Sequence, residues 1–299
     1  MRILDALETS RLLPYAELLG EIQAVLKNKK AGRARAPERL VMELPAGGSL
    51  LLMPAVDDQL AITKLVTVHP KERSSVKAEV WVMSAHTGER IALLDGAAVT
   101  ARRTAAVSLL AAKLLAPNRD GPLLVVGSGV QAKAHLEAFH DALGISEVYV
   151  CSRSSQNAAR LADYATSLGL RALVIGNPAE VSGKVTLVVT ATTSSSPVIP
   201  DNLRSVAFVA AVGAFRPDMA ELPTGLIGRA CLFVDSLEGA KAEAGDLIQA
   251  SVDWSRVTPL ENVIEGARPQ KGPVVFKSVG HALWDLAACR LAVRKLSHT

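Results

Sequence analysis

Apolar and polar positions follow two different patterns along this chain, and the change falls near residue 117. In the first part, apolar residues at helical spacing predict a helix over 10–28. Short alternating runs predict strands over 39–44, 49–53, 61–68, 79–84 and 90–95. The last two strands flank His86-Thr87-Gly88, which is typical of a hairpin turn. An Ala- and Leu-rich helix is predicted over 100–115, before Pro117.

From residue 122 onward, strand-like runs alternate with helix-length segments. The runs are PLLVVGSG, SEVYVCSR, RALVIG, KVTLVVTAT, SVAFVAAVGA and CLFVDS. Such alternation is typical of βαβ units, whose strands form a parallel sheet. We therefore predict an α/β fold, with a Rossmann-type doubly wound parallel sheet over 117–278 beside an α+β domain over 1–116. A final helix is predicted over 278–296.

Composition and charge exclude several classes of protein. The 299 residues are 49% hydrophobic with a net charge of +4, so a large core is expected. The basic residues are dispersed, and no nucleic-acid-binding motif accompanies them. Neither a signal peptide nor an apolar run of roughly 18 residues is present, so no membrane association is expected. The three cysteines Cys151, Cys231 and Cys289 form no disulfide or zinc pattern. We expect a cytoplasmic protein without a metal site.

A glycine-rich motif closes the first strand of the second region. Gly127-Ser128-Gly129-Val130-Gln131-Ala132 matches G-x-G-x-x-A between an apolar strand and a helix. In this motif Gly127 permits the tight turn, Gly129 lets the backbone approach a pyrophosphate, and Ala132 allows close packing of the helix on the sheet. The alternative is an ordinary glycine-rich turn. The strand, the helix and the following βαβ units favour a dinucleotide-binding site.

The end of the second strand indicates which dinucleotide binds. Sites that prefer NAD usually carry an acid there, whereas this chain has Ser152-Arg153-Ser154. Arg153 is suited to pairing with a 2′-phosphate, helped by the neighbouring hydroxyls, although an exposed loop arginine is the alternative. We predict NADPH as the cofactor, with NADH as the second possibility. Thr190-Ala191-Thr192 follows another parallel strand and is expected to line the same site.

Several segments together resemble the ornithine cyclodeaminase/mu-crystallin family across nearly the whole chain. They are LLLMPAV (50–56), TKLVTVHP (63–70), LLDGAAVTARRTAAVSLLAAKLLA (93–116), VVGSGVQA (125–132), VTATTSSSPV (189–198), VGAFRPDMAEL (212–222), DSLEGAKAEAGDL (235–247) and FKSVGHALWDL (276–286). The resemblance implies a Rossmann domain and a second domain, 1–116, that binds substrate and dimerises. It also implies that the C-terminal helix, 279–299, joins the N-terminal domain, and that the protein is a homodimer.

The resemblance further implies a small amino or imino acid held by its carboxylate against the nicotinamide. The matching cations are Arg39, Lys64 and Arg103. Chemistry supports the set, because a carboxylate that leaves water needs opposite charge and hydrogen bonds. Lys64 is expected to share a strand face with Ile62 and Val66, where an unpaired ammonium is unfavourable. For each cation alone, the alternative is a surface or salt-bridging side chain.

Two apolar residues stand where the family's ornithine cyclodeaminases carry acids. Phe215 follows the Val212-Gly213-Ala214 turn, and Leu51 lies two positions before Met53. Phenylalanine cannot act as a base or accept a hydrogen bond from an ammonium group. The alternative for both residues is plain core packing. We expect a substrate that has no distal amine.

These features predict an NADPH-dependent oxidoreductase acting on C=N. The predicted reaction is reduction of a cyclic ketimine, Δ1-pyrroline-2-carboxylate and/or Δ1-piperideine-2-carboxylate, to L-proline or L-pipecolate. Lys64 is the predicted catalytic residue, which clamps the carboxylate and relays a proton. The alternatives within the family are an ornithine cyclodeaminase or an alanine-type dehydrogenase. A non-catalytic, mu-crystallin-like ligand-binding protein is the alternative from another class, and the retained glycines and cations weigh against it.

Overall fold

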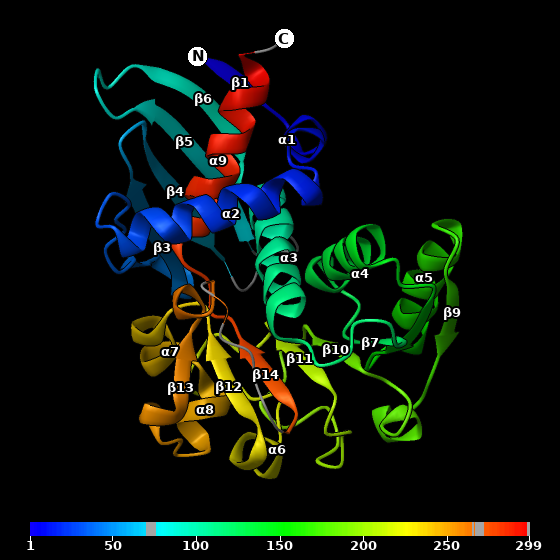
Figure 1. Ribbon diagram of the computed structural model, residues 1–299. Coiled ribbons are helices and arrows are strands. Elements are labelled where there is room, and N and C mark those ends of the chain that lie inside the picture. Colours follow the sequence, from blue (N-terminus) through cyan, green and yellow to red (C-terminus); the bar gives the residue numbers. More distant parts are fainter. Residues whose placement is uncertain (70–75, 265, 267–271, 298–299) are drawn as a thin grey trace. The chain divides into compact units, whose positions relative to one another are not determined.

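Two separate β-sheets organise the chain, one in each of two structural units (Figure 1). The computed structural model describes residues 1–69, 76–264, 266 and 272–297. Unit 1 comprises residues 1–106 and 281–299, and unit 2 comprises residues 107–280. Helix α3 (Gly96–Leu115) begins in unit 1 and ends in unit 2. The domain boundaries proposed from the sequence stay predictions.

Unit 1 contains a mainly antiparallel sheet in the order β1-β6-β5-β4-β3-β2, in which only β1 and β6 pair in parallel. Its strands are β1 (Arg2–Leu4), β2 (Leu40–Leu44), β3 (Gly48–Val56), β4 (Leu60–Val68), β5 (Val76–Ser84) and β6 (Arg90–Asp95). The five predicted strands and the β5–β6 hairpin are confirmed. The three-residue strand β1 was not predicted, because three residues show no periodicity.

Side chains of this sheet alternate between two different environments. Ile62 and Lys64 on β4 are buried, whereas their neighbours Thr63 and Leu65 are only partly buried. Helix α9 (Ala282–Leu296) packs on β3 and β4, and α2 packs on α9 (Figure 1). Because strand side chains alternate, α9 covers the face that carries Lys64.

The single helix predicted over 10–28 is wrong. The chain forms α1 (Ala6–Leu12) and α2 (Tyr15–Lys30), which Leu13 and Pro14 separate. Proline lacks the N–H of a helix interior and disfavours helical backbone at the preceding residue, so Pro14 begins a new helix. Asp5 and Glu8 form a capping box that starts α1 before the predicted position.

Unit 2 contains an all-parallel sheet in the order β13-β12-β14-β11-β10-β7-β8-β9. Its strands are β7 (Leu123–Val126), β8 (Glu147–Cys151), β9 (Arg171–Val174), β10 (Leu187–Thr190), β11 (Phe208–Ala211), β12 (Cys231–Val234), β13 (Val257–Pro259) and β14 (Val274–Lys277). The strand order reverses between β7 and β10, where doubly wound sheets bind nucleotides at the carboxyl ends of their strands. The predicted fold class is confirmed, although β13 and β14 were not predicted.

Helix α4 packs on β7 and β10, and α5 packs on β8 and β9. The helices of this unit are α4 (Val130–Leu143), α5 (Ser155–Ser167), α6 (Thr224–Arg229), α7 (Leu237–Glu243) and α8 (Gly245–Gln249). Short 3-10 turns are η1 (Pro45–Gly47) in unit 1, and η2 (Pro178–Val181), η3 (Trp254–Arg256) and η4 (Leu260–Asn262) in unit 2. Among the described residues, no helix has the length and apolar character to cross a membrane.

Candidate active site

The glycine-rich turn between β7 and α4 has the backbone that a dinucleotide requires. Gly127 has φ +117°, and a Cβ at this position would meet the carbonyl oxygen of Ala191 at 2.4 Å. Gly129 precedes α4, and a Cβ there would meet nothing within 4 Å. Ala132 is fully buried in the first turn of α4. The turn thus leaves open backbone at a helix N-terminus, which suits a pyrophosphate.

Three predicted cofactor segments lie after the carboxyl ends of the adjacent strands β7, β8 and β10. The backbone N–H of Gly127 donates to Cys151 over 2.8 Å, and that of Ala191 donates to Val126 over 2.8 Å. The hydroxyls of Ser128 and Ser152 are 2.8 Å apart. The structure therefore brings these segments together at one edge of the sheet.

Arg153 is an exposed cation at this edge, directly after β8. The Ser154 hydroxyl accepts the backbone N–H of Asn157 and caps α5. Val130 and Gln131 lie in the first turn of α4, and Val130 is exposed. An exposed guanidinium at the end of the second strand is available to a nucleotide phosphate.

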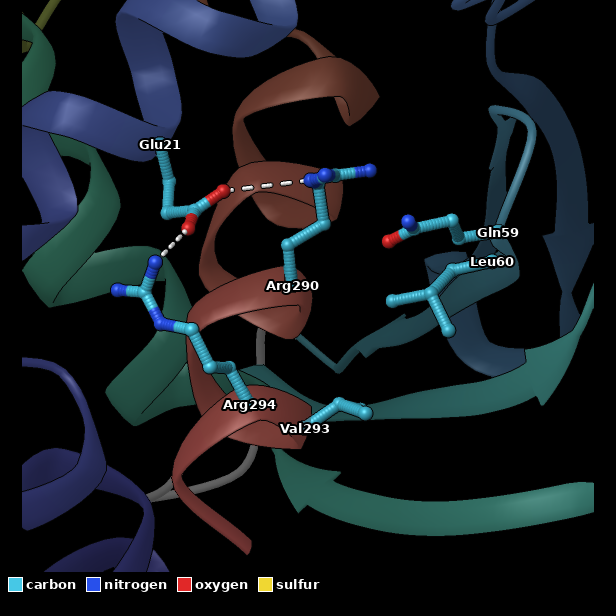
Figure 2. A pocket seen from close by; sticks show the side chains of 6 residues that line it. All are labelled: Glu21, Gln59, Leu60, Arg290, Val293 and Arg294. Carbon is cyan, nitrogen blue, oxygen red and sulfur yellow. Dashed lines mark hydrogen bonds and ion pairs between the residues drawn. The ribbon is translucent and has the colours of Figure 1, made fainter. Parts of the chain in front are cut away.

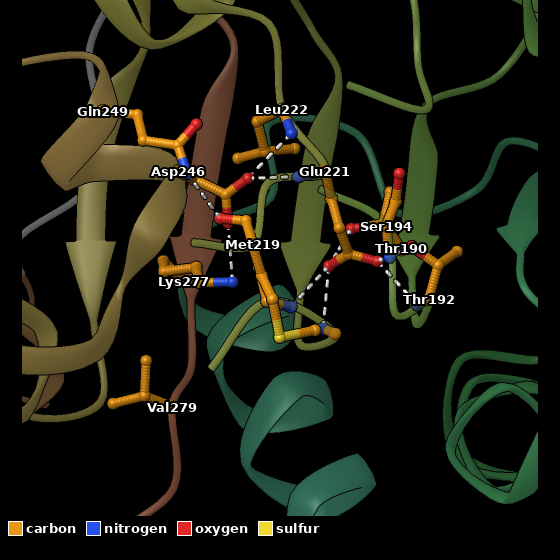
Figure 3. Close-up of polar contacts among 12 residues, drawn as sticks. Thr190, Thr192, Ser194, Met219, Glu221, Leu222, Asp246, Gln249, Lys277 and Val279 are labelled. Atoms are coloured by element: carbon orange, nitrogen blue, oxygen red, sulfur yellow. Dashed lines mark hydrogen bonds and ion pairs between the residues drawn. The ribbon is translucent and has the colours of Figure 1, made fainter. Parts of the chain in front are cut away.

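Glu221 joins the strand-end turns that follow β10 and β11, and it was not predicted as a functional residue. Its fully buried carboxylate accepts five hydrogen bonds (Figure 3). The donors are the Thr190 hydroxyl (3.0 Å), the Thr192 N–H (2.6 Å) and hydroxyl (2.9 Å), the Gly213 N–H (2.7 Å) and the Ala214 N–H (3.3 Å). The two threonine hydroxyls thus fix the turns to Glu221.

Asp246 and Lys277 extend this network into the core of unit 2. One carboxylate oxygen of Asp246 accepts the backbone N–H groups of Glu221 and Leu222. Its other oxygen lies 2.7 Å from the ammonium nitrogen of Lys277, whose side chain is fully buried on β14 (Figure 3). We call Glu221, Asp246 and Lys277 the unit 2 cluster.

A second buried charge cluster lies in unit 1. The ammonium of Lys64 on β4 lies 2.8 Å from one carboxylate oxygen of Asp285, and the Arg103 Nε atom donates to the other over 3.1 Å. Lys64 also donates to the Thr100 hydroxyl over 3.3 Å. Lys64, Arg103 and Asp285 are 2%, 5% and 0% exposed, so almost no water screens their charges. We call these three residues the unit 1 cluster.

Burial and neighbouring charges shift the protonation of this cluster. Burial is the main cause that lowers the pKa of Lys64 from 10.5 to about 8, with Arg103 and Arg39 acting in the same direction. Asp285 opposes this shift. Burial would raise the pKa of Asp285, but attraction by Lys64 and Arg103 outweighs it and lowers that pKa. The cluster therefore contains two cations and one anion near neutral pH.

Strand register places Arg39 and Leu51 on the sheet face of Lys64. Met53 pairs with Lys64, and Leu51 lies two residues before Met53 on the same face. Continuing the β2–β3 register by one residue puts Arg39 opposite Met53. Four of the predicted substrate-binding residues, Arg39, Leu51, Lys64 and Arg103, thus belong to unit 1.

Phe215 belongs to unit 2, in the turn after β11, and is 46% exposed. This exposure contradicts plain core packing, the alternative interpretation for this residue. Asp218, the acid further along the turn, is exposed and pairs with Arg216 through hydrogen bonds of 3.1 Å. The turn therefore presents an apolar ring to its surroundings, and its carboxylate is held by a neighbouring arginine.

Asp285 is the functional candidate that sequence reasoning missed. A signal existed, because Asp285 is the one acid in the stretch HALWDLAAC, whose helical residues are all buried. A lone acid among buried apolar positions requires a cationic partner. Lys277 in VVFK and Glu221 in MAEL are likewise single charged residues among buried apolar residues.

A doubly wound parallel sheet with an open glycine turn at a helix N-terminus is typical of proteins that depend on a nicotinamide dinucleotide. Comparison with known proteins gives the family. The model of the Ornithine cyclodeaminase/mu-crystallin family matches residues 2–299, and the chain belongs to this family.

Individual relatives are reductases. The chain is 39% identical over 294 residues to Delta(1)-pyrroline-2-carboxylate reductase 1 of Burkholderia multivorans, covering 97% of this chain and 94% of the relative. It is 38% identical to the Delta(1)-pyrroline-2-carboxylate/Delta(1)-piperideine-2-carboxylate reductase of Azospirillum brasilense, with the same coverage. Among solved structures, the Delta(1)-pyrroline-2-carboxylate reductase of Thermococcus litoralis, in complex with NADH and L-proline, superposes with a TM-score of 0.92. It is 27% identical, and the match covers 100% of this chain and 98% of that one.

These comparisons confirm the family, the oxidoreductase class and the nicotinamide cofactor that the sequence predicted. The roles of individual site residues stay predictions.

Proposed function

We propose that this protein reduces a cyclic ketimine carboxylate, Δ1-pyrroline-2-carboxylate and/or Δ1-piperideine-2-carboxylate, with NADPH to give L-proline or L-pipecolate. The observation that carries the proposal is the unit 1 cluster. Two buried cations face one buried acid, which leaves one positive charge for a ligand carboxylate to balance. The reductase relatives support the same reaction.

The unit 1 cluster has hydrogen-bond donors that Asp285 does not use. Arg103 bonds Asp285 through Nε, so the Nη groups at the end of the guanidinium are not taken by that carboxylate. Such a planar group suits a second carboxylate. Arg39 on the same sheet face adds positive charge, and Leu51 adds apolar surface for a ring.

The cofactor segments of unit 2 fit a bound dinucleotide. The open backbone of Gly129 and the α4 N-terminus suit the pyrophosphate, and exposed Arg153 suits a 2′-phosphate. The roles of Gln131, Thr190 and Thr192 are to shape this edge of the sheet. When bound, NAD(P)H supplies two electrons and one hydrogen to the C=N carbon. The absence of an acid after β8 favours NADPH over NADH.

Lys64 is the proton donor in this proposal. Its pKa of about 8 leaves the ammonium mostly protonated near neutral pH, yet makes it a better acid than an ordinary lysine. An Nζ–H bond breaks as an N–H bond forms at the imine nitrogen, and water later returns a proton to Lys64. A protonated imine accepts electrons at carbon more readily, which explains the need for an acid in the site.

The side chains predicted to contact the substrate argue against ornithine. A distal ammonium requires an acceptor, and Leu51 and Phe215 provide none. Asp218 is already paired with Arg216. A ring without a free amine suits these apolar side chains.

The test is oxidation of NADPH, followed by its absorbance, with each of the two cyclic ketimines. Ornithine with NAD and pyruvate with ammonia and NADPH are the controls. Rapid oxidation with a ketimine and none with the controls is expected. Turnover of ornithine would show that another residue replaces the two missing acids, and turnover of pyruvate would indicate an amino-acid dehydrogenase.

We also propose a homodimer formed through the second face of the unit 1 sheet. This face carries apolar residues on four neighbouring strands, and all are only partly buried: Leu52, Pro54, Leu65, Trp81 and Leu93. A group of apolar side chains left partly exposed is typical of an interface between copies. Analytical ultracentrifugation of Trp81→Glu is expected to show a monomer, and the parent protein a dimer.

A further inference from the structure

Asp285 occupies a central position that the predicted set of site residues does not include. It lies in the first turn of α9, with its side chain fully buried. Each of its two carboxylate oxygens contacts a different cation, Lys64 at 2.8 Å and Arg103 at 3.1 Å. The carboxylate therefore connects residues from β4 and α3 through a residue of α9.

We infer that Asp285 is the positioning residue of the reductase site, which orients Lys64 and Arg103 so that their remaining N–H groups meet the substrate. This inference rests on the proposed function. Two cations alone would repel each other, and the long lysine side chain would be free to turn away. A single acid between them fixes both geometries and still leaves one net positive charge.

Charges around Lys64 set its protonation as well as its position. From α3 it faces Arg103, from α9 it faces Asp285, and Arg39 precedes β2. Cys289, one helical turn after Asp285, has a raised pKa because it is buried and near that carboxylate, so the thiol is neutral. Asp285 is thus the one anion among these groups, and it keeps Lys64 charged against burial and two like charges.

A nearby cluster on the same helix offers a comparison. Arg290 of α9 pairs with Glu21 of α2, and Arg294 also pairs with Glu21, at 2.7 Å (Figure 2). Arg290 pairs with Asp57 as well. A cavity of about 220 Å³ is lined by Glu21, Arg290 and Arg294, together with Gln59, Leu60 and Val293. The number of acids in this cluster equals or exceeds the number of cations, so it has no surplus positive charge. Its ion pairs hold α9 against the elements packed on it. Asp57 provides a buried acid that pairs with α9 but does not contact Lys64.

The experiment compares Asp285→Asn with Asp57→Asn in the full-length protein. Asparagine keeps the shape of the side chain and removes its charge, so the pKa of Lys64 is expected to fall by about one unit or more. The basic limb of the kcat/KM pH profile should move to lower pH, with a loss of about tenfold or more above pH 8 and a smaller loss near pH 6. Asp57→Asn should leave the limb in place.

A purely structural role gives a different result. In that case Asp285→Asn would lower kcat/KM by the same factor at every pH, and this outcome would overturn the inference. Asp285→Glu should restore the position of the basic limb, because it restores the charge, even if its longer side chain lowers kcat. Failure of Asp285→Glu to move the limb back would also overturn it.

A measurement without substrate or cofactor separates the two proposals. NMR of nitrogen-labelled lysine side chains follows the titration of Lys64 directly. A lower pKa in Asp285→Asn but not in Asp57→Asn supports the inference even if no ketimine is reduced, in which case the proposed function alone fails. An unchanged pKa of Lys64 contradicts the inference even if the ketimine is reduced.

Discussion

The two buried charge clusters of this protein differ in how their charges are balanced. In the unit 2 cluster, Lys277 pairs with Asp246, and Asp246 and Glu221 accept backbone and hydroxyl hydrogen bonds on both sides (Figure 3). In the unit 1 cluster, Lys64 and Arg103 share the single carboxylate of Asp285. By formal charge the first cluster has one surplus negative charge, which the five hydrogen bonds to Glu221 compensate, whereas the second has one surplus positive charge.

This difference favours a structural role for the unit 2 cluster and supports the proposed ligand-binding role of the unit 1 cluster. A buried charge is tolerated when hydrogen bonds and an opposite charge compensate it, and such a network fixes the loops that it joins. Glu221 does this for the turns after β10 and β11. A surplus buried cation instead favours binding of an anion, which supports the carboxylate substrate proposed for unit 1.

The largest expected effect is the loss of catalysis in Lys64→Met. Methionine fills a similar volume but has no proton to donate and no charge for the carboxylate. We expect kcat/KM for the ketimine to fall by about a thousandfold, within the usual range for a lost general acid. Steady-state assays with each ketimine measure this.

Unlike catalysis, the free energy of unfolding should be little affected by Lys64→Met. Asp285 keeps Arg103 as its partner in this variant, so urea unfolding should change little. Lys27→Met, at an exposed position of α2, is the matched control and should change neither quantity. Near-normal turnover of Lys64→Met would remove Lys64 from the mechanism.

Lys277→Met should show the opposite behaviour. It leaves the Asp246 carboxylate buried without its cation, so we expect a loss of about 3–5 kcal/mol in the free energy of unfolding. Urea unfolding monitored by circular dichroism measures this loss. The double variant Lys277→Met with Asp246→Asn removes both charges and should recover part of it. A stability equal to that of Lys64→Met would mean that the two clusters do not differ in the way described.

The sequence predicted the parallel sheet well where strands alternate with helix-length segments. This alternation identified six strands but not β13 and β14, although five of those six have four residues, as β14 does. The described elements before β13 and β14 are the short 3-10 turns η3 and η4, so the alternation that marks βαβ units is absent there. The helix predicted over 10–28 failed because Pro14 was given too little weight against the apolar pattern on both sides of it.

In the candidate site, the sequence predicted residues whose chemistry indicates a role without knowledge of their neighbours. The cations and the glycines are of this kind. Asp285 acts through Lys64 and Arg103, which are far from it in the chain, and only the packing of α9 on the unit 1 sheet brings the three together. The same reason hides Glu221, whose partners are mostly backbone N–H groups.

Protonation of His135 tests whether a buried charge without a partner destabilises unit 2. His135 is fully buried in α4 and bonds Gln131 and Ser108 through its two ring nitrogens. Burial lowers its pKa from 6.5 to about 4. Above pH 6.5 the ring is neutral in both states, so it contributes no pH dependence. Between pH 6.5 and 4 the unfolded chain binds a proton that the folded protein does not, so stability falls as the pH falls.

The expected loss from His135 is about 3 kcal/mol across this window. Urea unfolding at several pH values measures it, and His135→Gln should flatten the dependence. His86→Gln, in the exposed hairpin turn, should not. An unchanged slope in His135→Gln would show that other groups cause the loss.

Arg153 is an exposed cation of unit 2 directly after β8, and we expect it to bind a ligand and not to stabilise the fold. Among the described residues it makes no ion pair that would hold it elsewhere, so a 2′-phosphate is its expected partner. Arg153→Ala should raise KM for NADPH by about tenfold and leave KM for NADH unchanged, because NADH lacks that phosphate. Arg160→Ala removes another exposed arginine, from α5, and should affect neither cofactor. Equal losses with both cofactors would show that Arg153 supports the loop after β8, and the preference for NADPH would then need another cause.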